Sequence, residues 1–244
     1  MSAWTKAYSK VLATVSASDA PTLYYRGHAN AKWQLLPGLA RIDPSIIASC
    51  SPPTVRRLEE DLYSEFLTQA GGLLPRANGD WDNVFAMQHH GMPTRLLDWT
   101  ETFAIALFFA LRGASETACV WILDPFELNR SSIGRPETFD CSELGTSYRD
   151  AFFGNATFLH DGAAAISVIR HLPRISSQRA TFTLHGNLHV SLEKLYPTVV
   201  TKIPLPVTAH AEAREYLALA GVSEFSLFPD LDGLAREMRE KSGL

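Results

Sequence analysis

The chain has 244 residues, 46% of them hydrophobic and 20% charged, which is typical of a folded globular protein with a sizeable core. Its formal net charge of −4 gives no overall positive field, which argues against a general nucleic-acid coat protein but allows a local basic groove. The three cysteines lie far apart without a CxxC pair, so neither a disulfide framework nor a zinc ribbon is expected.

Neither a secretion signal nor a membrane span is predicted. The opening sequence MSAWTKAYSK lacks the apolar segment of a signal peptide, and the longest apolar run, Phe103–Leu111, is too short to cross a bilayer. We therefore expect a cytoplasmic protein without membrane contact.

The first half of the chain predicts one strand and two helices. The β-prone sequence TLYYR at 22–26 predicts a strand, which Gly27 is expected to end. Apolar residues recur three or four positions apart from Val55 to Ala70 and predict an amphipathic helix. Residues Trp81–His90 predict a second helix, closed by the turn that starts at Gly91.

The middle of the chain predicts a buried core. Leu96-Leu97 indicates a short strand, Thr102–Leu111 a helix that is apolar on every side, and Cys119–Leu123 another strand. Residues 125–170 show few strong patterns.

The last part predicts further strands at Ala180–Leu184 and Thr198–Ile203. A helix is expected over Thr208–Ala220 with Thr208 as N-cap, and a final short helix follows Asp230 as its N-cap. No linker divides the chain, so we predict one α+β domain over 1–244, with its core at about 22–234.

The first candidate site is Tyr25-Arg26-Gly27-His28. An arginine at a strand end can offer its guanidinium to phosphate or carboxylate, and a neighbouring glycine lets a ligand approach the main chain. The alternative is an ordinary surface ion pair at a turn.

Gln88-His89-His90 forms the second candidate. Adjacent helical residues point about 100° apart, so the two histidines do not chelate one metal, and no metal site is expected. His89 suits hydrogen bonding or acid–base chemistry, but it equally suits a structural role in the core.

The densest polar cluster runs from Thr94 through Arg95 and Asp98 to Thr100. Along a strand, Leu97 and Trp99 would share one face with Arg95, while Asp98 and Thr100 would share the other. Asp98 also precedes the apolar helix and resembles a helix cap, so it is either a cap, a site residue or both.

Three later polar residues remain ambiguous. Gln178 precedes a predicted strand and suits binding of a ribose hydroxyl, although a polar residue at a strand edge needs no function. Glu224 has no evident partner, and Asp230 lacks the spacing of a calcium loop. The chain has no GxGxxG, GxxxxGK[ST] or GxSxG motif, which disfavours the corresponding nucleotide-binding and hydrolase folds.

The chain resembles the FRG domain family. Its aromatic-Arg-Gly motif appears at Tyr25-Arg26-Gly27, and its signature QHxGxPTRLLDWT is matched from Gln88 to Thr100. The resemblance extends from about Thr22 to Leu234 and implies a setting in toxin or phage-defence systems.

A weaker resemblance links the chain to ADP-ribosyltransferases of the Arg-Ser-Glu class. The order of the aromatic-Arg-Gly strand, the Asp98-Trp99-Thr100 strand end and the apolar helix is similar to theirs. This resemblance implies a split sheet and an NAD site in which Arg26 supports NAD and Thr100, with Asp98, occupies the serine motif. The later glutamate of that class has no counterpart, and Gln178 is the residue nearest that place.

The leading hypothesis is therefore an enzyme that cleaves NAD and transfers ADP-ribose to an unknown protein or nucleic acid. Arg26, His89, Asp98 and Gln178 would act in catalysis. Binding of NAD is assigned to the following residues: Tyr25, Arg26, Gly27, His28, Gln88, Thr94, Arg95, Trp99 and Thr100. Two alternatives remain, a non-catalytic module that senses a nucleotide or a phage component and a metal-independent nuclease that uses His28 and His89. An antitoxin or a phage protein is a possible partner.

Overall fold

The computed structural model describes residues 1–51, 53–74, 79–154, 159, 161–167 and 176–243. The helices and strands in chain order are α1 (Ala3–Ser16), β1 (Tyr24–His28), η1 (Gly38–Arg41), α2 (Pro44–Ala48), α3 (Val55–Ala70), α4 (Asp80–His89), β2 (Leu96–Thr100), α5 (Phe103–Leu111), β3 (Ala118–Leu123), α6 (Pro125–Ile133), β4 (Phe139–Asp140), η2 (Cys141–Leu144), α7 (Tyr148–Phe152), β5 (Ala163–Ser167), β6 (Ala180–His185), α9 (Leu192–Leu195), β7 (Val200–Leu205), η3 (Val207–Ala209), α10 (His210–Leu219), α11 (Glu224–Leu227) and α12 (Leu231–Ser242).

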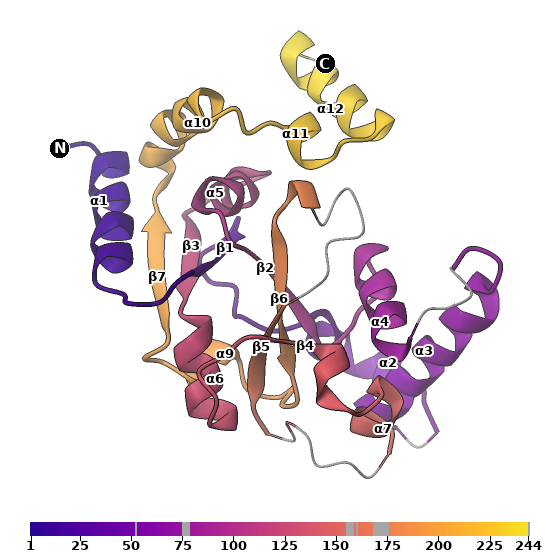
Figure 1. Ribbon diagram of the computed structural model, residues 1–244. Helices are drawn as coiled ribbons and strands as arrows, with labels where there is room; N and C mark the ends of the chain where they lie inside the picture. Colours follow the sequence, from indigo (N-terminus) through magenta and orange to yellow (C-terminus); the bar gives the residue numbers. More distant parts are fainter. Residues whose placement is uncertain (52, 75–78, 155–158, 160, 168–175, 244) are drawn as a thin grey trace.

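The strands form one sheet of seven in the order β4-β5-β6-β2-β1-β3-β7, with helices around it (Figure 1). The pair β4–β5 is parallel and the other neighbouring pairs are antiparallel. The predicted α+β class and the mixed sheet are confirmed. The predicted strands are confirmed with shifted ends, whereas the sequence gave no prediction of α1 or of the elements between 125 and 167.

The sheet is weakest between β1 and β2. These strands are joined by the single residue pair Tyr25–Thr100, whereas β1 pairs with β3 over five positions and β2 pairs with β6 over five. Beyond Thr100 and Tyr25 the two strands therefore separate, which leaves the main-chain groups on the facing edges open to other partners. In Figure 1, β1 and β2 lie beside each other near the centre of the molecule.

The helices that cover one face of the sheet form two separate groups. Directly paired residues point to the same face, so Tyr25, Thr100 and the alternate residues of β2 share one side. On that side, α1, α5 and α10 pack around Tyr25, while α3, α4 and α7 pack around Leu96. The opposite face carries a third cluster that includes Leu97 and Trp99 together with residues of α6 and α9. The predicted alternation is thus confirmed from Leu96 to Thr100. Arg95 precedes β2 and contacts Glu59 and Phe152 on the side of Leu96, so the prediction that it shares a face with Leu97 and Trp99 is wrong.

Gly27 lies inside β1, so the prediction that it ends the strand is wrong. A Cβ atom at this position would lie 1.9 Å from the carbonyl oxygen of Ala106 and 2.4 Å from the main-chain nitrogen of Ala110. Both residues belong to α5, which packs directly on β1. Glycine is required here because the helix backbone occupies the space of a side chain.

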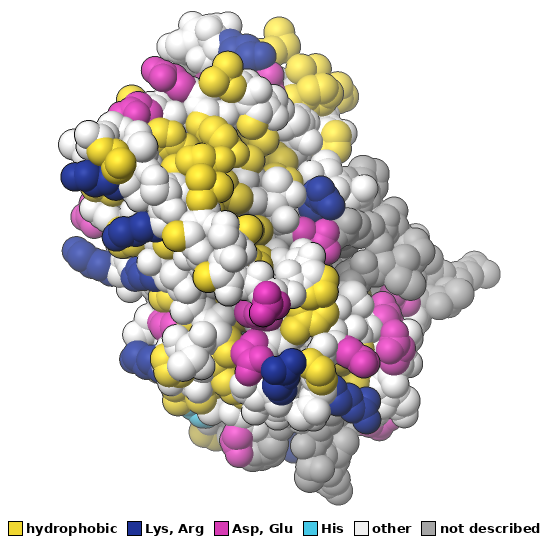
Figure 2. Space-filling model, turned by 60° about the vertical axis from the view of Figure 1, so that its left-hand side comes forward, with side chains coloured by type: hydrophobic (Ala, Val, Ile, Leu, Met, Phe, Trp, Pro, Cys, Tyr) yellow, Lys and Arg dark blue, Asp and Glu magenta, His cyan; other side chains and the backbone are white. Residues whose placement is uncertain are grey.

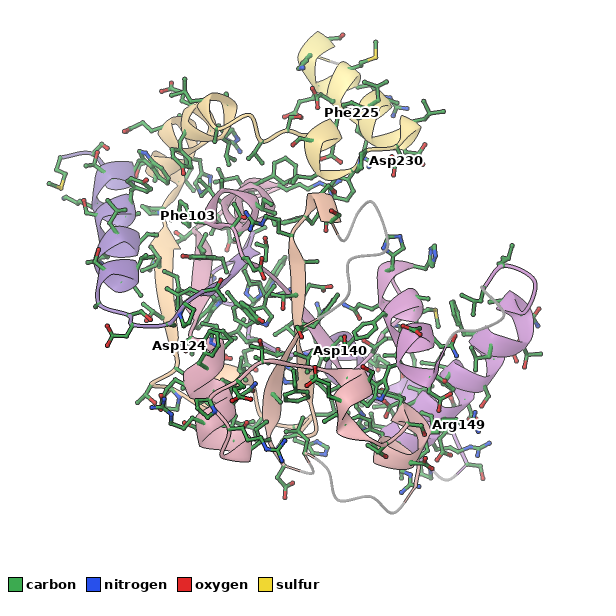
Figure 3. The ribbon with its side chains drawn as sticks, in the orientation of Figure 1. Phe103, Asp124, Asp140, Arg149, Phe225 and Asp230 are labelled. Atoms are coloured by element: carbon green, nitrogen blue, oxygen red, sulfur yellow. The ribbon has the colours of Figure 1, made fainter. Side chains whose placement is uncertain are left out.

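Aspartate side chains cap the N-termini of several helices. Asp124 accepts hydrogen bonds from the main chain at the start of α6, Asp140 does so for η2, and Asp230 does so for α12, as predicted (Figure 3). The prediction that Thr208 is the N-cap of α10 is wrong, because η3 precedes α10 and places Ala209 at the N-cap position.

An aromatic cluster joins the N-terminal helix to the rest of the fold. The rings of Trp4, Tyr8, Phe103 and Tyr216 contact one another with centroid separations of 5.4–6.5 Å. Figure 2 turns the side of α1 and α10 forward and shows apolar side chains gathered in the upper half of that view. In the part of the chain that the structure describes, no helix has both the length and the apolarity to cross a membrane.

The close contact at Gly27 predicts the effect of adding one methyl group. Gly27→Ala should lower the free energy of unfolding by about 3 kcal/mol, because α5 must move away from β1. Gly72→Ala is the matched control, since no atom lies within 4 Å of its added Cβ. Thermal unfolding of both variants measures the effect, and equal stability of the two would contradict the proposed contact.

Candidate functional site

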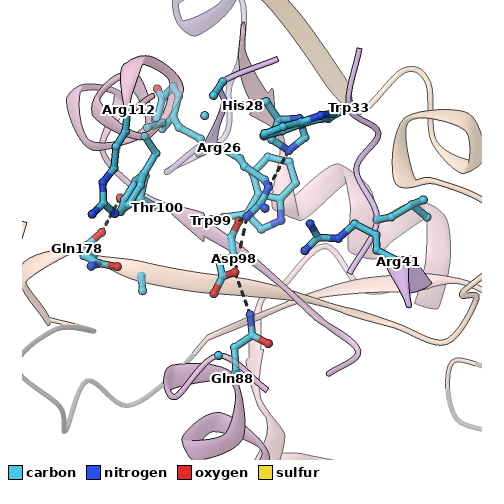
Figure 4. Close-up of a pocket in the computed structure, with 18 of the residues that line it drawn as sticks. Arg26, His28, Trp33, Arg41, Gln88, Asp98, Trp99, Thr100, Arg112 and Gln178 are labelled. Atoms are coloured by element: carbon cyan, nitrogen blue, oxygen red, sulfur yellow. Dashed lines mark hydrogen bonds and ion pairs between the residues drawn. The ribbon is translucent and has the colours of Figure 1, made fainter. Parts of the chain in front are cut away.

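A cavity of about 1060 Å³ opens where β1 and β2 separate, and polar side chains from both strands line it (Figure 4). Arg26, Gly27 and His28 come from β1, while Asp98 and Thr100 come from β2. Loop, helix and strand segments complete the wall with the following residues: Tyr25, Ala29, Lys32, Trp33, Gln34, Leu36, Arg41, Gln88, His89, His90, Gly91, Trp99, Ala106, Phe109, Arg112, Gln178 and Ala180.

Polar contacts cross the cavity wall from α4 to β1. The hydroxyl of Thr94 donates to Gln88 Oε1 over 2.6 Å, and Gln88 Nε2 donates to Asp98 Oδ2 over 2.9 Å. Arg26 Nη1 lies 3.7 Å from the same carboxylate oxygen and donates to the Asp98 main-chain oxygen over 2.5 Å. Arg26 Nε donates to His28 Nε2 over 3.0 Å. The order of donors and acceptors fixes the orientation of the Gln88 amide.

His28 is a neutral hydrogen-bond acceptor in this wall. Its pKa falls to about 3, chiefly because burial disfavours the imidazolium and also because Arg26 is positively charged. The main chain of Trp33 opposes this fall, and Arg41 and Lys202 add to it. Burial also lowers the pKa of Arg26 and the Asp98 carboxylate raises it, but an arginine remains protonated in water-accessible sites. Arg26 is therefore a fixed cation whose position His28 and Asp98 determine.

The cavity is positively charged within an acidic chain. Among its described lining residues, Arg26, Lys32, Arg41 and Arg112 are cationic, and Asp98 is the single acidic residue. The chain as a whole has a net charge of −4. Cations that line a concave site attract anions more strongly than the same charges spread on a surface. The arrangement favours an anionic ligand.

Trp33 provides an exposed aromatic face at the cavity. Its residue surface is 56% exposed, and its ring meets the His28 ring edge at a centroid distance of 6.0 Å. Trp99 also lines the cavity but is only 3% exposed, and its Nε1 donates to the Thr183 hydroxyl over 3.0 Å. Thr183 in turn contacts His185 Nε2. Trp99 is thus fixed in the core, and Trp33 is better placed to stack on a ligand ring.

Thr100 connects β2 to the segment that carries Gln178. The Thr100 hydroxyl donates to the Gln178 main-chain oxygen over 2.8 Å and accepts from the Thr102 main chain. The Gln178 amide donates to the Leu227 carbonyl over 3.2 Å. This contact places the Gln178 side chain between the cavity and the C-terminal helices.

Asp98 does not cap α5. It lies within β2, and Thr102 occupies the N-cap position without a capping hydrogen bond from its side chain. The capping interpretation is therefore wrong, because the strand continues to Thr100 and the helix begins only at Phe103. Its side chain is 55% exposed and faces the cavity. Within the described residues, no group of three metal-ligating side chains comes together.

Comparison with known proteins agrees with the motifs in this wall. Residues 21–119 match the FRG domain. The FRG domain therefore accounts for residues 21–119 of this chain. The matched segment includes β1, α4, β2 and α5, and so contains most of the cavity wall. No curated protein and no solved structure matches the chain.

Part of the FRG signature has a structural role away from the cavity. Arg95 is buried and donates to both carboxylate oxygens of Glu59 with separations of 2.7–2.9 Å. Its remaining nitrogen donates to the carbonyl of Gly186 at the end of β6, and its guanidinium lies 4.5 Å from the centre of the Phe152 ring. Tyr148 also donates to Glu59.

The position of Arg95 corrects its assignment as a cofactor-binding residue. Its donors are occupied in the core, and it does not line the cavity. Thr94 likewise lies behind the wall, where it holds Gln88. The other ten residues assigned to the site from the sequence all line the cavity.

The lining residues that the sequence did not identify include three cations, Lys32, Arg41 and Arg112, and the exposed Trp33. A tryptophan flanked by Lys32 and Gln34 just after the aromatic-Arg-Gly strand was an available signal, because exposed aromatic residues often mark binding sites. Arg112 gave no such signal, since its place depends on where α5 ends.

Glu224, for which the sequence indicated no partner, forms two ion pairs. Its Oε1 accepts from Arg112 over 2.8 Å and from Arg236 over 2.6 Å, and its side chain is 7% exposed. These partners come from α12 and the end of α5, which the sequence separates by more than a hundred positions.

The buried Arg95–Glu59 pair predicts a large loss of stability on mutation. Glu59→Ala should lower the free energy of unfolding by about 3–5 kcal/mol, because the arginine remains buried without its counterion. Glu60→Ala removes a partly exposed partner of Arg56 and Arg57 on the same helix and should cost less than about 1 kcal/mol. Urea unfolding compares the variants, and similar losses would disprove the structural role of the pair.

His185 predicts how stability depends on pH. Burial, with smaller effects of Arg26 and Arg95, lowers its pKa to about 3, against an unfolded value of about 6.5. The unfolded chain therefore binds the proton first, and stability falls as the pH drops from about 6.5 toward 3. Between pH 7 and 5 this histidine should account for about 2 kcal/mol of that loss.

Urea unfolding at pH 7 and pH 5 measures the effect. His185→Gln should reduce the pH-dependent loss, while replacement of the exposed His189 by Gln should not. An unchanged pH dependence in His185→Gln would contradict the assignment.

Proposed function

We propose that the cavity binds a dinucleotide of the NAD type and that the protein cleaves its nicotinamide–ribose bond. ADP-ribose would pass to an acceptor macromolecule or to water. The observation that carries this proposal is the gathering of four cations, an exposed tryptophan and one carboxylate in a cavity between two separating strands. Its volume of about 1060 Å³ is adequate for a dinucleotide, since ligand pockets commonly measure about 300–1,000 Å³.

The cations would bind the pyrophosphate of the ligand. Arg26 is the central candidate, because Asp98 and His28 hold its guanidinium beside the opening between β1 and β2. Lys32 and Arg41 stand beside Trp33, whose exposed face would stack on a base or on the nicotinamide ring. Charge and stacking together suit a nucleotide better than an inorganic anion.

Asp98 would stabilise the positive charge that develops on the ribose. When the bond between the anomeric carbon and nicotinamide nitrogen breaks, nicotinamide leaves with the electron pair and the ribose becomes oxocarbenium-like. A hydroxyl of the acceptor, or water, then bonds to the anomeric carbon and loses its proton. His89 lines the same cavity and is the candidate group to accept that proton. The order of motifs from Arg26 to α5, similar to that of ADP-ribosyltransferases, supports this assignment.

One observation favours a second function, binding of the nucleotide without cleavage. The Asp98 carboxylate already interacts with Gln88 and Arg26, and Gln178 carries no charge with which to stabilise a cation. A positively charged wall also opposes an oxocarbenium ion. The protein would then sense a nucleotide rather than consume it.

Incubation with NAD, with nicotinamide release followed by chromatography, distinguishes the two functions. Arg26→Ala should weaken NAD binding by about 10- to 100-fold, because it removes charge-assisted hydrogen bonds to phosphate. Asp98→Asn should leave binding nearly intact and reduce nicotinamide release by about 100-fold. Calorimetric titration of each variant with NAD separates binding from cleavage.

The control is Asp61→Asn, which alters an exposed ion pair with Arg57 on α3. It should match the wild type in both assays. NAD binding without nicotinamide release, with candidate acceptors supplied, would favour the sensing function. The absence of NAD binding by the folded wild type would refute both.

A further inference from the structure

The C-terminal helices contact the cavity through a cluster of charge and ring contacts. Phe228, which is 4% exposed, has the guanidinium of Arg112 at 4.9 Å from its ring centre and that of Arg236 at 5.2 Å. Both arginines donate to the same oxygen of Glu224. Figure 3 shows Phe225 on α11 and Asp230 at the start of α12, in the helical pair that contains this cluster.

Arg112 belongs to both the cluster and the cavity. It follows α5 directly and lines the cavity together with Phe109, whose ring packs against Phe228. Arg236 is not among the described residues that line it. The cluster has a formal charge of +1, because it contains two arginines and one glutamate. Arg112 is the charged residue of the cluster that lines the cavity.

The geometry leaves part of the Arg112 guanidinium for a ligand. Glu224 accepts from Nη2 of Arg112 through a single oxygen, and the arginine side chain remains 44% exposed. A guanidinium has five N–H donors, so the contact with Glu224 leaves donors on its other edge. Glu224 itself is 7% exposed and bound from two sides, which prevents it from following Arg112 into the cavity.

The same segment also contacts a second residue that lines the cavity. The hydroxyl of Ser177 and the amide of Gln178 both donate to the Leu227 carbonyl, over 3.0 and 3.2 Å. Residues Glu224–Phe228 therefore contact two cavity-lining residues, Arg112 and Gln178, which come from distant parts of the chain. These C-terminal residues lie outside the segment that matches the FRG domain.

We infer that Arg112 binds an anionic group of the ligand and that Glu224 and Phe228 are positioning residues that hold its guanidinium at the cavity wall. The inference rests on the proposed function only in requiring a phosphate-bearing ligand. A free arginine loses much side-chain entropy when it binds phosphate, and the contacts with Glu224 and Phe228 restrict that freedom beforehand. The C-terminal helices thereby contribute to ligand affinity without reaching the ligand.

Calorimetric titration with inorganic pyrophosphate and with ADP-ribose tests the inference. Arg112→Met should weaken binding of both probes by roughly 10-fold, because a charge-assisted hydrogen bond is lost. Glu224→Gln should weaken binding several-fold although it removes a negative charge, because Arg112 loses its fixed position. If Glu224 competed with the ligand for Arg112, Glu224→Gln would instead tighten binding of both probes. This result would overturn the positioning role.

Arg236→Met is the matched control. It removes the other arginine on Glu224 and Phe228 and should lower the melting temperature about as much as Arg112→Met, but it should weaken binding of both probes far less, because Arg236 does not line the cavity. Equal effects of the two arginine variants on affinity, or no effect of either, would overturn the inference.

The two proposals fail in different ways. Pyrophosphate binding that depends on Arg112, without NAD binding or cleavage, would support this inference and refute the NAD assignment. Nicotinamide release that depends on Arg26 but not on Arg112 would support the NAD assignment and overturn this inference. Failure of the wild type to bind pyrophosphate or ADP-ribose at millimolar concentration would likewise overturn it.

Discussion

The single residue pair between β1 and β2 is the constraint on which the rest of the site depends. Tyr25 and Thr100 hold the two halves of the sheet together, and the strands separate beyond them. Strand edges that lack a neighbour need other hydrogen-bond partners. Arg26 supplies one by donating to the Asp98 main chain across the opening, which brings a cation and a carboxylate together at the centre of the cavity. The gap in the sheet thus creates both the space and its polar lining.

Close packing behind the opening keeps β1 in place. The backbone of α5 approaches Gly27 more closely than any side chain would permit, and the small residues Ala106 and Ala110 form the contact. The direction of α5 in turn determines where Arg112 emerges at its end. One glycine therefore links the position of Arg26 on the strand to the position of Arg112, a second cation that lines the cavity.

The FRG signature combines two kinds of residue. Gln88 and Asp98 point into the cavity, whereas Thr94 and Arg95 hold the same segment from behind. Arg95 does this through a buried ion pair with Glu59, which costs desolvation and is stable only because its donors are well matched. A motif of this kind fixes the geometry of a site as much as it supplies its chemistry.

The sequence by itself determined the local elements and most residues of the cavity wall. Periodicity and β-propensity predicted α3, α4, α5 and the strands near their observed places, because these signals depend on neighbours within a few positions. The motifs at Tyr25–His28 and Gln88–Thr100 identified nine site residues that line the cavity, and Gln178 was the tenth. The same information also suggested that Asp98 caps a helix, because the end of a strand and the start of a helix can have similar sequences over four residues.

Only the tertiary structure decided which of these residues meet. Arg95 and Asp98 are three positions apart, yet one pairs with Glu59 in the core and the other faces the cavity. Glu224 finds its partners in Arg112 and Arg236 because α11 and α12 return to the end of α5. The charge of the cavity is likewise a property of the fold, since its cations come from separate segments of an acidic chain. Such contacts depend on chain reversal and packing over long separations, which local sequence patterns do not encode.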